Sequence, residues 1–256
     1  MKALIDGDVL RYQCGFPADG EPVENALYNT KKLIKEILSA VGADDYRIYL
    51  TGKGNFRYDV ATIKPYKGTR SGHKPEHYNA ITDYLINVWK AEIVEGMEAD
   101  DAMSIEQCKL FEDKEEGTYG RSVICTIDKD LDMVPGNHYN WNTDDRYWCD
   151  SYGGLALDET KSKPKCVGAG IMFFWAQMLM GDTVDNIPGV PRVGPVKAYN
   201  LLKDCQTEDE LFCIVGQQYA YKYDDPEAAM LENGRLLWML QKENKHWELP
   251  ISNETI

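Results

Sequence analysis

The sequence predicts an α/β protein with a parallel-sheet core and a helical C-terminal part. Along residues 2–142, short apolar runs that resemble strands alternate with helical segments, which is the order of a parallel sheet with crossover helices. From about Val167 onward, the apolar residues follow helical spacing instead. With 256 residues, 43% of them hydrophobic, the chain can form one large domain or a core with a smaller lobe.

The individual elements follow from these patterns. We expect strands at 2–5, 46–50, 91–94, 123–127 and 139–142, and helices at 25–41, 78–89 and from Glu98 onward. Gly42 is a helix-stop signal after the apolar positions 27, 33, 34, 37, 38 and 41. In the second part, helices are expected at 170–180, from Pro195 to Lys203, and in two further segments ending near Trp247, with 161–165 as a polar bridge between the two parts.

Composition restricts the class of partner and the compartment. The net charge of −14 argues against a polyanion, but residues 60–75 carry four cations and no acid. No signal peptide and no apolar run of about 18 residues is present, so we expect no membrane span and a cytoplasmic location. The seven cysteines are scattered without zinc spacing, as in reduced thiols, and the four histidines show no ligand spacing with one another.

Acidic residues gather where the predicted strands end. They follow the first strand, open the helix at 98 and follow the strand at 123–127: Asp6, Asp8, Glu98, Asp100, Asp101, Asp128, Asp130 and Asp132. The carboxyl ends of parallel strands share one edge, so these groups should lie together and repel one another. A divalent cation with hard oxygen ligands, Mg²⁺ or Mn²⁺, is the usual compensation. This pattern predicts a carboxylate metal site for phosphate chemistry.

A second constellation lies in the helical part. Asp182 and Asp185 are three residues apart, so on a helical turn both would face one way. They precede a turn rich in Pro and Gly, after which the N–H groups of Gly194 and Val196 could bind a phosphate at the start of a helix. Such a unit grips a DNA backbone without reading bases. An ordinary turn between two helices is the alternative.

In this order, the segments EADD, TIDKDLD and MGDTVDNIPGVPRVGPVKA resemble motifs of the 5′-nuclease (flap endonuclease) superfamily, in particular its compact bacteriophage 5′→3′ exonucleases. The resemblance implies a PIN/5′-nuclease-like α/β core at 1–165 with an arch at about 67–95. It also implies a helical DNA-binding lobe at 166–256 with a helix–hairpin–helix at about 180–203. The implied activity is hydrolysis of DNA phosphodiesters, as a 5′→3′ exonuclease or a structure-specific 5′-flap endonuclease, by a two-metal mechanism.

The resemblance also assigns roles to residues. Two Mg²⁺ or Mn²⁺ ions would be held by the family's carboxylates, which here are Asp6, Glu98, Asp100, Asp101, Asp128, Asp130, Asp182 and Asp185. The catalytic residues would be Lys67, Arg70, Asp128 and Asp130. DNA would be bound by Tyr66, Lys67, Arg70, Gly189, Val190, Arg192, Val193, Gly194, Val196 and Lys197, and the hairpin at 189–194 would also hold K⁺.

One position departs from the family pattern. The family usually has an aspartate closing the second strand shortly before Phe-Arg, and here Thr51 stands there instead. Either one metal is held more weakly, or Asp8 substitutes for the missing ligand. Asp8 and Asp132 thus either join the metal ligands or are surface charges or caps.

The implied partners are duplex or flap DNA with 5′ ends, or an RNA–DNA hybrid, with no membrane; if the chain is phage-encoded, it acts in the cytoplasm of a bacterial host. Two alternatives remain open. A DNA-end-binding protein on the same scaffold would have lost catalysis, a reading that rests on Thr51. A phosphatase resembling the haloacid dehalogenase superfamily would use Asp6 as nucleophile and Asp8 as general acid, which leaves the later acidic motifs unexplained.

Overall fold

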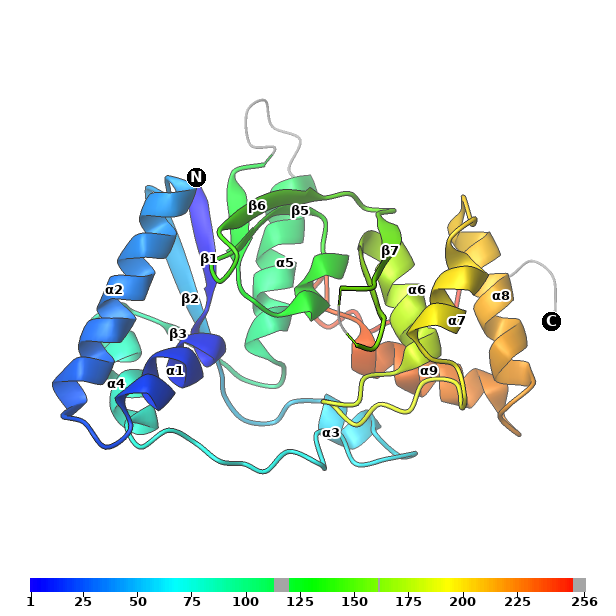
Figure 1. Ribbon diagram of the computed structural model, residues 1–256, viewed down its shortest axis with the longest axis horizontal. Helices are drawn as coiled ribbons and strands as arrows, with labels where there is room; N and C mark the ends of the chain where they lie inside the picture. Colours follow the sequence, from blue (N-terminus) through cyan, green and yellow to red (C-terminus); the bar gives the residue numbers. More distant parts are fainter. Residues whose placement is uncertain (113–119, 161, 251–256) are drawn as a thin grey trace. The chain divides into compact units, whose positions relative to one another are not determined.

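The computed structural model describes residues 1–112, 120–160 and 162–250. It forms two compact units (Figure 1). The first contains residues 1–55, 71–149 and 241–243. The second contains residues 56–70, 150–240 and the described residues from 244 onward. The predicted division at 165 remains a prediction.

A six-stranded sheet forms the centre of the first unit. Its order is β3 (Glu92–Val94), β2 (Asp45–Thr51), β1 (Lys2–Asp6), β4 (Ser122–Cys125), β5 (Gly136–Asn140) and β6 (Asp145–Cys149). The strands from β3 to β5 are parallel, and β6 is antiparallel to β5. Ile5 pairs with Cys125 and Asp6 with Tyr49, so β1, β2 and β4 end close together at one edge.

Helices cover both faces of this sheet. On one face, α1 (Gly7–Gly15), α2 (Val23–Val41) and α4 (Tyr78–Asn87) form a single core with the sheet, and the short 3₁₀ helix η1 (Phe16–Ala18) joins α1 to α2. Ile5 of β1, Ile37 of α2 and Leu85 of α4 are completely buried there. Because side chains alternate along a strand, Leu4 and Ile124 point to the opposite face, where α5 (Ala99–Glu112) packs (Figure 1).

Most of the predicted elements of this unit are confirmed within one or two residues, with a larger offset for β5. Gly42 ends α2 in the left-handed conformation, with φ 61°, which glycine adopts without strain. Strand β6 was missed because four of its five residues are exposed, so it shows no apolar alternation. Within the predicted arch, Ile81 and Leu85 of α4 are buried in the core, and the longest stretch without helix or strand is 67–77.

The second unit is built around α6 (Gly170–Met180). Its aromatic residues Phe173, Phe174 and Trp175 are almost fully buried. Around it lie α7 (Pro195–Leu202), α8 (Glu208–Ala220) and α9 (Pro226–Leu237). The hairpin β7 (Gly154–Asp158) and β8 (Lys165–Ala169) also packs there. The expected polar bridge at 161–165 is therefore wrong at its end, because Lys165 already pairs with Asp158 in this hairpin; residue 161 lies outside the described residues.

Residues 56–70 belong to the second unit because buried polar contacts attach them to α9. Arg57, in the single-turn helix α3 (Arg57–Val60), is completely buried. Its guanidinium donates to the carbonyls of Leu236 at 3.0 Å and Trp238 at 2.8 Å. The Glu232 carboxylate accepts the backbone N–H groups of residues 62 and 63 at 2.9 and 2.8 Å. A hydrophilic segment is thereby fixed without a large apolar face.

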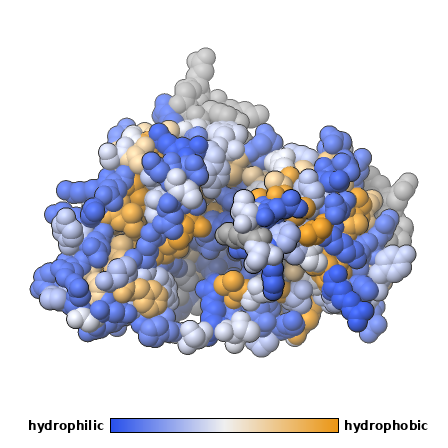
Figure 2. Space-filling view, viewed as in Figure 1, coloured by the Kyte–Doolittle hydropathy of each residue, from blue (hydrophilic) through white to orange (hydrophobic). Residues whose placement is uncertain are grey.

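The face of the molecule in Figure 2 is mainly hydrophilic, with separate hydrophobic patches. Among the residues that the structure describes, no helix combines the length and apolar character needed to cross a bilayer.

Candidate active site

The ends of β1 and β4 place two aspartates next to each other. Asp6, only 2% exposed, caps α1 by accepting the Val9 N–H at 3.0 Å. Its other oxygen accepts the hydroxyl of Thr126 at 2.8 Å. The same hydroxyl accepts the N–H of Asp128 at 3.0 Å. Thr126, buried just after β4, therefore fixes both acidic residues at the carboxyl edge of the sheet.

Asp8 reaches the end of β2 because Gly7 lets α1 approach that strand. A Cβ atom on Gly7 would lie 2.5 Å from the Tyr49 carbonyl oxygen, closer than any side chain permits. The Asp8 carboxylate accepts the N–H of Thr51 at 3.1 Å and also pairs with Arg11. The Asp8 carboxylate therefore lies at the end of β2, beside Thr51.

The first turn of α5 carries the third group of acids. The Ala99 N–H donates to the Thr51 hydroxyl at 2.9 Å, so Thr51 caps α5 from the end of β2. Asp101 accepts the Glu98 N–H at 3.0 Å, which satisfies another N-terminal donor of the helix. The side chain of Asn55 holds the Glu98 carboxylate at 2.8 Å. Asp101, fully buried in this role, anchors the helix start that presents Asp100.

Electrostatics show which carboxylates interact. Burial, then Asp8, raises the pKa of Asp6 to about 7, against the lowering effect of its hydrogen bonds. The pKa of Asp100 is raised well above its usual value by burial and by repulsion from four carboxylates: Asp6, Asp128, Glu98 and Asp8. Five acids therefore share one electrostatic environment, in which Arg11 pairs with Asp8 alone among the interactions described above. Their oxygen donors suit Mg²⁺ or Mn²⁺, whose charge would relieve this repulsion.

Asp130 lies at the margin of this acidic cluster. It is in the 3₁₀ helix η2 (Lys129–Met133), and its N–H donates to the Asp128 carboxylate at 3.0 Å. Its own carboxylate pairs with Lys129 at 3.0 Å. The Asp132 carboxylate faces β6 instead, where it accepts the Tyr147 hydroxyl at 2.7 Å. Metal binding by Asp101 and Asp130 therefore remains a prediction.

In the second unit, the predicted basic motif converges on Asp185. The carboxylate accepts the buried Tyr66 hydroxyl at 2.7 Å, pairs with Arg70, and lies 3.8 Å from the Lys67 ammonium. The Lys67 N–H also donates to the Asp185 carbonyl at 2.9 Å. Asp182 accepts the N–H groups of Val184 and Asp185 at 2.7 and 3.1 Å, which orders the turn. The Lys67 and Arg70 side chains, which were expected to contact phosphate, are therefore positioned by Asp185, one of the predicted metal ligands.

The predicted hairpin joins α6 to α7. Gly181 and Gly189 have φ of 69° and 57°, and a Cβ on either would come within 2.2 Å of backbone atoms. Val190 and Val193 are buried anchors of this turn. The remaining predicted contacts, namely Arg192, Gly194, Val196 and Lys197, are exposed at the start of α7. The Gly189 carbonyl, expected to bind K⁺, accepts the Tyr223 hydroxyl.

Sequence spacing did not reveal one further cluster. Within the described ranges, Asp132, His138 and Cys149 are the group of three metal-ligating side chains whose donor atoms, one from each residue, lie within 4.8 Å of one another. Burial lowers the pKa of His138 to about 4, so its ring is neutral at pH 7. The three residues come from η2, β5 and β6, and strand pairing, not a motif, brings them together.

Comparison with known proteins gives one sequence relative and a set of solved structures. No family model matches the chain. It is 27% identical over 216 residues to a 5′-3′ exonuclease of Buchnera aphidicola subsp. Schizaphis graminum, covering 78% of this chain and 69% of the relative. It superposes on the T5 D15 protein co-crystallised with metal ions with a TM-score of 0.61 at 17% identity, covering 94% of this chain and 89% of that one. For the bacteriophage T5 D15 flap endonuclease in a pseudo-enzyme–product complex with DNA and metal ions, the TM-score is 0.62 at 17% identity, with 94% and 88% covered.

These similarities confirm the fold class and the resemblance to the 5′-nuclease superfamily predicted from the sequence. The roles of individual site residues remain predictions.

Proposed function

We propose that this chain is a nuclease that hydrolyses DNA phosphodiesters near 5′ ends and depends on divalent cations. The observation that carries the proposal is the group of five interacting carboxylates at the shared edge of β1, β2 and β4. Support comes from the relative named as a 5′-3′ exonuclease and from the T5 protein, whose structures contain metal ions and DNA. The likeness to the T5 structures, at 17% identity, supports the fold, and the acidic cluster supports metal-dependent hydrolysis.

The carboxylates that would hold two divalent cations include Asp6, Asp100 and Asp128, with Glu98 and Asp8 beside them. When bound, Mg²⁺ or Mn²⁺ would lower the pKa of water and offset charge on the attacking and leaving oxygens. The chain's own contribution is to hold the carboxylate oxygens in place before the cations bind. Thr126 orients Asp6 and Asp128, while Asp101 fixes the helix start that carries Asp100.

Asp8 takes the place of the strand-closing aspartate that this sequence lacks. Its carboxylate is held at the end of β2 by the Thr51 N–H and acts electrostatically on both Asp6 and Asp100. Thr51 itself serves as a cap for α5. A carboxylate is therefore present at the end of β2 despite Thr51, and this favours an active enzyme over a catalytically inert DNA-end-binding protein.

Lys67 and Arg70 would offset charge on the phosphate. In this structure their charges face Asp185, so a phosphate must compete with that carboxylate or share the cations with it. The exposed start of α7, with Arg192 and Lys197, would grip the DNA backbone without reading bases.

The test is cleavage of a 5′-labelled flap duplex with Mg²⁺, compared with the same duplex carrying a blocked 5′ end and with a 3′-flap duplex. We expect short 5′-labelled products from the first substrate only and none in EDTA. Asp8→Asn should lower the rate by about 100-fold or more, whereas Asp83→Asn, at an exposed position of α4, should match the wild type. Binding without cleavage in either Mg²⁺ or Mn²⁺ would instead identify an inert end-binding protein.

A further inference from the structure

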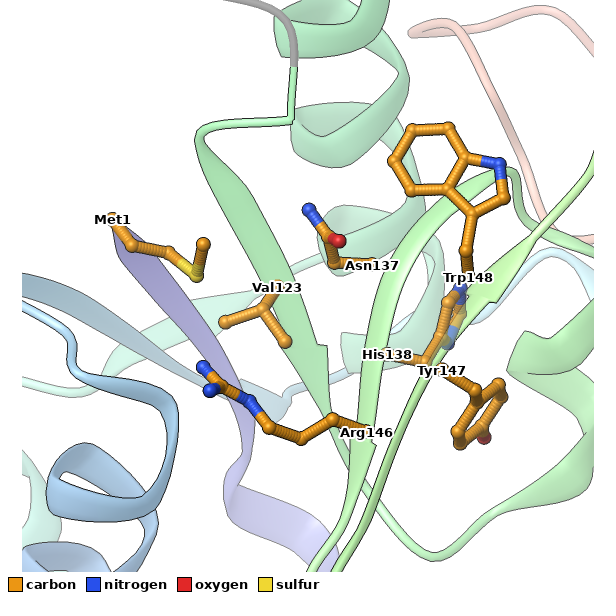
Figure 3. Close-up of a pocket in the computed structure, with 7 residues that line it drawn as sticks. All are labelled: Met1, Val123, Asn137, His138, Arg146, Tyr147 and Trp148. Atoms are coloured by element: carbon orange, nitrogen blue, oxygen red, sulfur yellow. The ribbon is translucent and has the colours of Figure 1, made fainter.

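A second cluster of metal-ligating side chains lies on the outer strands of the sheet. In the antiparallel pair of β5 and β6, His138 is directly opposite Tyr147, and Cys149 follows Tyr147 by two residues. Side chains two apart on a strand share a face, so His138, Tyr147 and Cys149 lie on one side. Figure 3 shows Arg146 and Tyr147 extending to opposite sides of β6, as this alternation requires. Asp132, in η2, completes the cluster within 4.8 Å.

The histidine is prepared to act as a ligand. Its Nε2 lies 2.8 Å from the Val134 carbonyl oxygen; because a carbonyl only accepts, Nε2 carries the hydrogen. In the neutral ring, Nδ1 then carries a lone pair. His138 is only 1% exposed, and this nitrogen has no hydrogen-bond partner among the described residues. Metal-binding histidines commonly donate their other N–H to a backbone carbonyl in this way, whereas an unpaired buried nitrogen is costly.

The rest of the cluster has a fixed and accessible geometry. Tyr147 stacks on the His138 ring at 5.4 Å between centroids and 21° between planes. Its hydroxyl donates to Asp132 at 2.7 Å, so one tyrosine orients both ligands. Cys149 is fully buried and not in a disulfide. Asp132 is partly exposed, so an ion can reach the cluster from solvent on that side.

We propose that Asp132, His138 and Cys149 form a binding site for a transition metal of the Zn²⁺ class, separate from the acidic cluster. A thiolate and an imidazole select Zn²⁺ or Co²⁺ over Mg²⁺, which prefers oxygen ligands only. On binding, Cys149 loses its thiol proton to solvent, and the three protein ligands leave one position for water. Asp132 and Asp130 are both in η2, so metal binding would fix the 3₁₀ helix that follows Asp128. This proposal does not depend on the nuclease function.

The test is titration of the full chain, reduced with a phosphine, with Co²⁺ alone. We expect a thiolate-to-cobalt charge-transfer absorption that reaches its plateau at one equivalent and is removed by Zn²⁺. Carboxylate sites cannot give this absorption because they contain no sulfur. Cys149→Ser should abolish it, and Cys166→Ser, a buried cysteine of β8, should leave it unchanged.

Two further variants keep the test decisive if Cys149→Ser does not fold. Asp132→Asn, at a partly exposed position, and His138→Gln should each weaken Co²⁺ binding by at least about 10-fold, since even outer-shell changes have such effects. No charge-transfer absorption in the wild type would overturn the proposal. An absorption that survives Cys149→Ser, or that neither Asp132→Asn nor His138→Gln weakens, would overturn it equally.

Discussion

Replacing Asp6 by Asn should stabilise the protein in the absence of divalent cations while it removes activity. Asp6 is 2% exposed and faces Asp8 and Asp128. Asn has the same shape, keeps an oxygen for the Val9 N–H, and carries no charge. The variant therefore removes repulsion and desolvation without creating a cavity, so a site selected for cation binding should gain stability when one acid is neutralised.

The magnitude follows from the pKa of Asp6, which rises from 3.8 to about 7 in the folded protein. Each unit corresponds to about 1.4 kcal/mol, so ionised Asp6 destabilises the fold by at most about 4 kcal/mol. A raised folded-state pKa gives stability that is full below pH 3.8 and is lost as pH rises to about 7. In EDTA, the gain from Asp6→Asn should thus be largest at pH 8 and small near pH 4.

The assay is urea unfolding in EDTA at pH 5 and pH 8, repeated at pH 8 with Mg²⁺. We expect Asp6→Asn to raise the free energy of unfolding at pH 8 by about 2–4 kcal/mol, and Mg²⁺ to stabilise the wild type more than the variant. Asp83→Asn, which is exposed, should change neither. An Asp6→Asn variant that is less stable than wild type at pH 8 in EDTA would refute the reasoning, because its hydrogen bonds would then outweigh the repulsion.

Three further predictions concern positions that hold the sites in place. Gly7→Ala should cost about 1–3 kcal/mol in urea unfolding and slow flap cleavage, because its Cβ would collide with β2; an unchanged midpoint would contradict the close approach. Arg57→Ala should lower the free energy of unfolding by about 2–4 kcal/mol, because it leaves two buried carbonyls unpaired. The control Arg192→Ala, at an exposed position, should change it by no more than about 0.5 kcal/mol, and equal effects of the two variants would refute the anchoring role of Arg57. Asp185→Asn should tighten DNA binding in EDTA, measured by fluorescence anisotropy at low salt, since it frees the charge of Lys67; weaker binding would argue that the ion pair orders the DNA-binding surface.

The sequence was most informative where one physical pattern dominates. Period and burial located the strands of the parallel sheet and the apolar helix α6, whose predicted bounds are the observed ones. The acidic residues at strand ends were expected to share one edge, and repulsion among Asp6, Asp100 and Asp128 shows that these three do. Parallel pairing made that inference possible because it carries all strand ends to the same side.

Features that depend on individual contacts could not be predicted. Strand β6 is exposed and joins the sheet only by pairing with β5. The attachment of residues 56–70 to α9 depends on the hydrogen bonds of buried Arg57 and of Glu232. No local sequence pattern predicts either set of hydrogen bonds. Likewise, no spacing rule links Asp132, His138 and Cys149, because strand register brings them together.

The central claim, that the acidic cluster performs metal-dependent cleavage, is tested most directly by separating DNA binding from chemistry. The measurement is single-turnover cleavage of a 5′-labelled flap duplex by the wild type and by Asp128→Asn/Asp130→Asn, with affinity for the same duplex measured by anisotropy. We expect the wild type to cleave in Mg²⁺ and the double variant to cleave at least about 100-fold more slowly. The affinity of the double variant for the duplex should stay within about threefold of wild type, since the basic side chains expected to bind phosphate are unaltered. Undiminished cleavage by the double variant would contradict the claim.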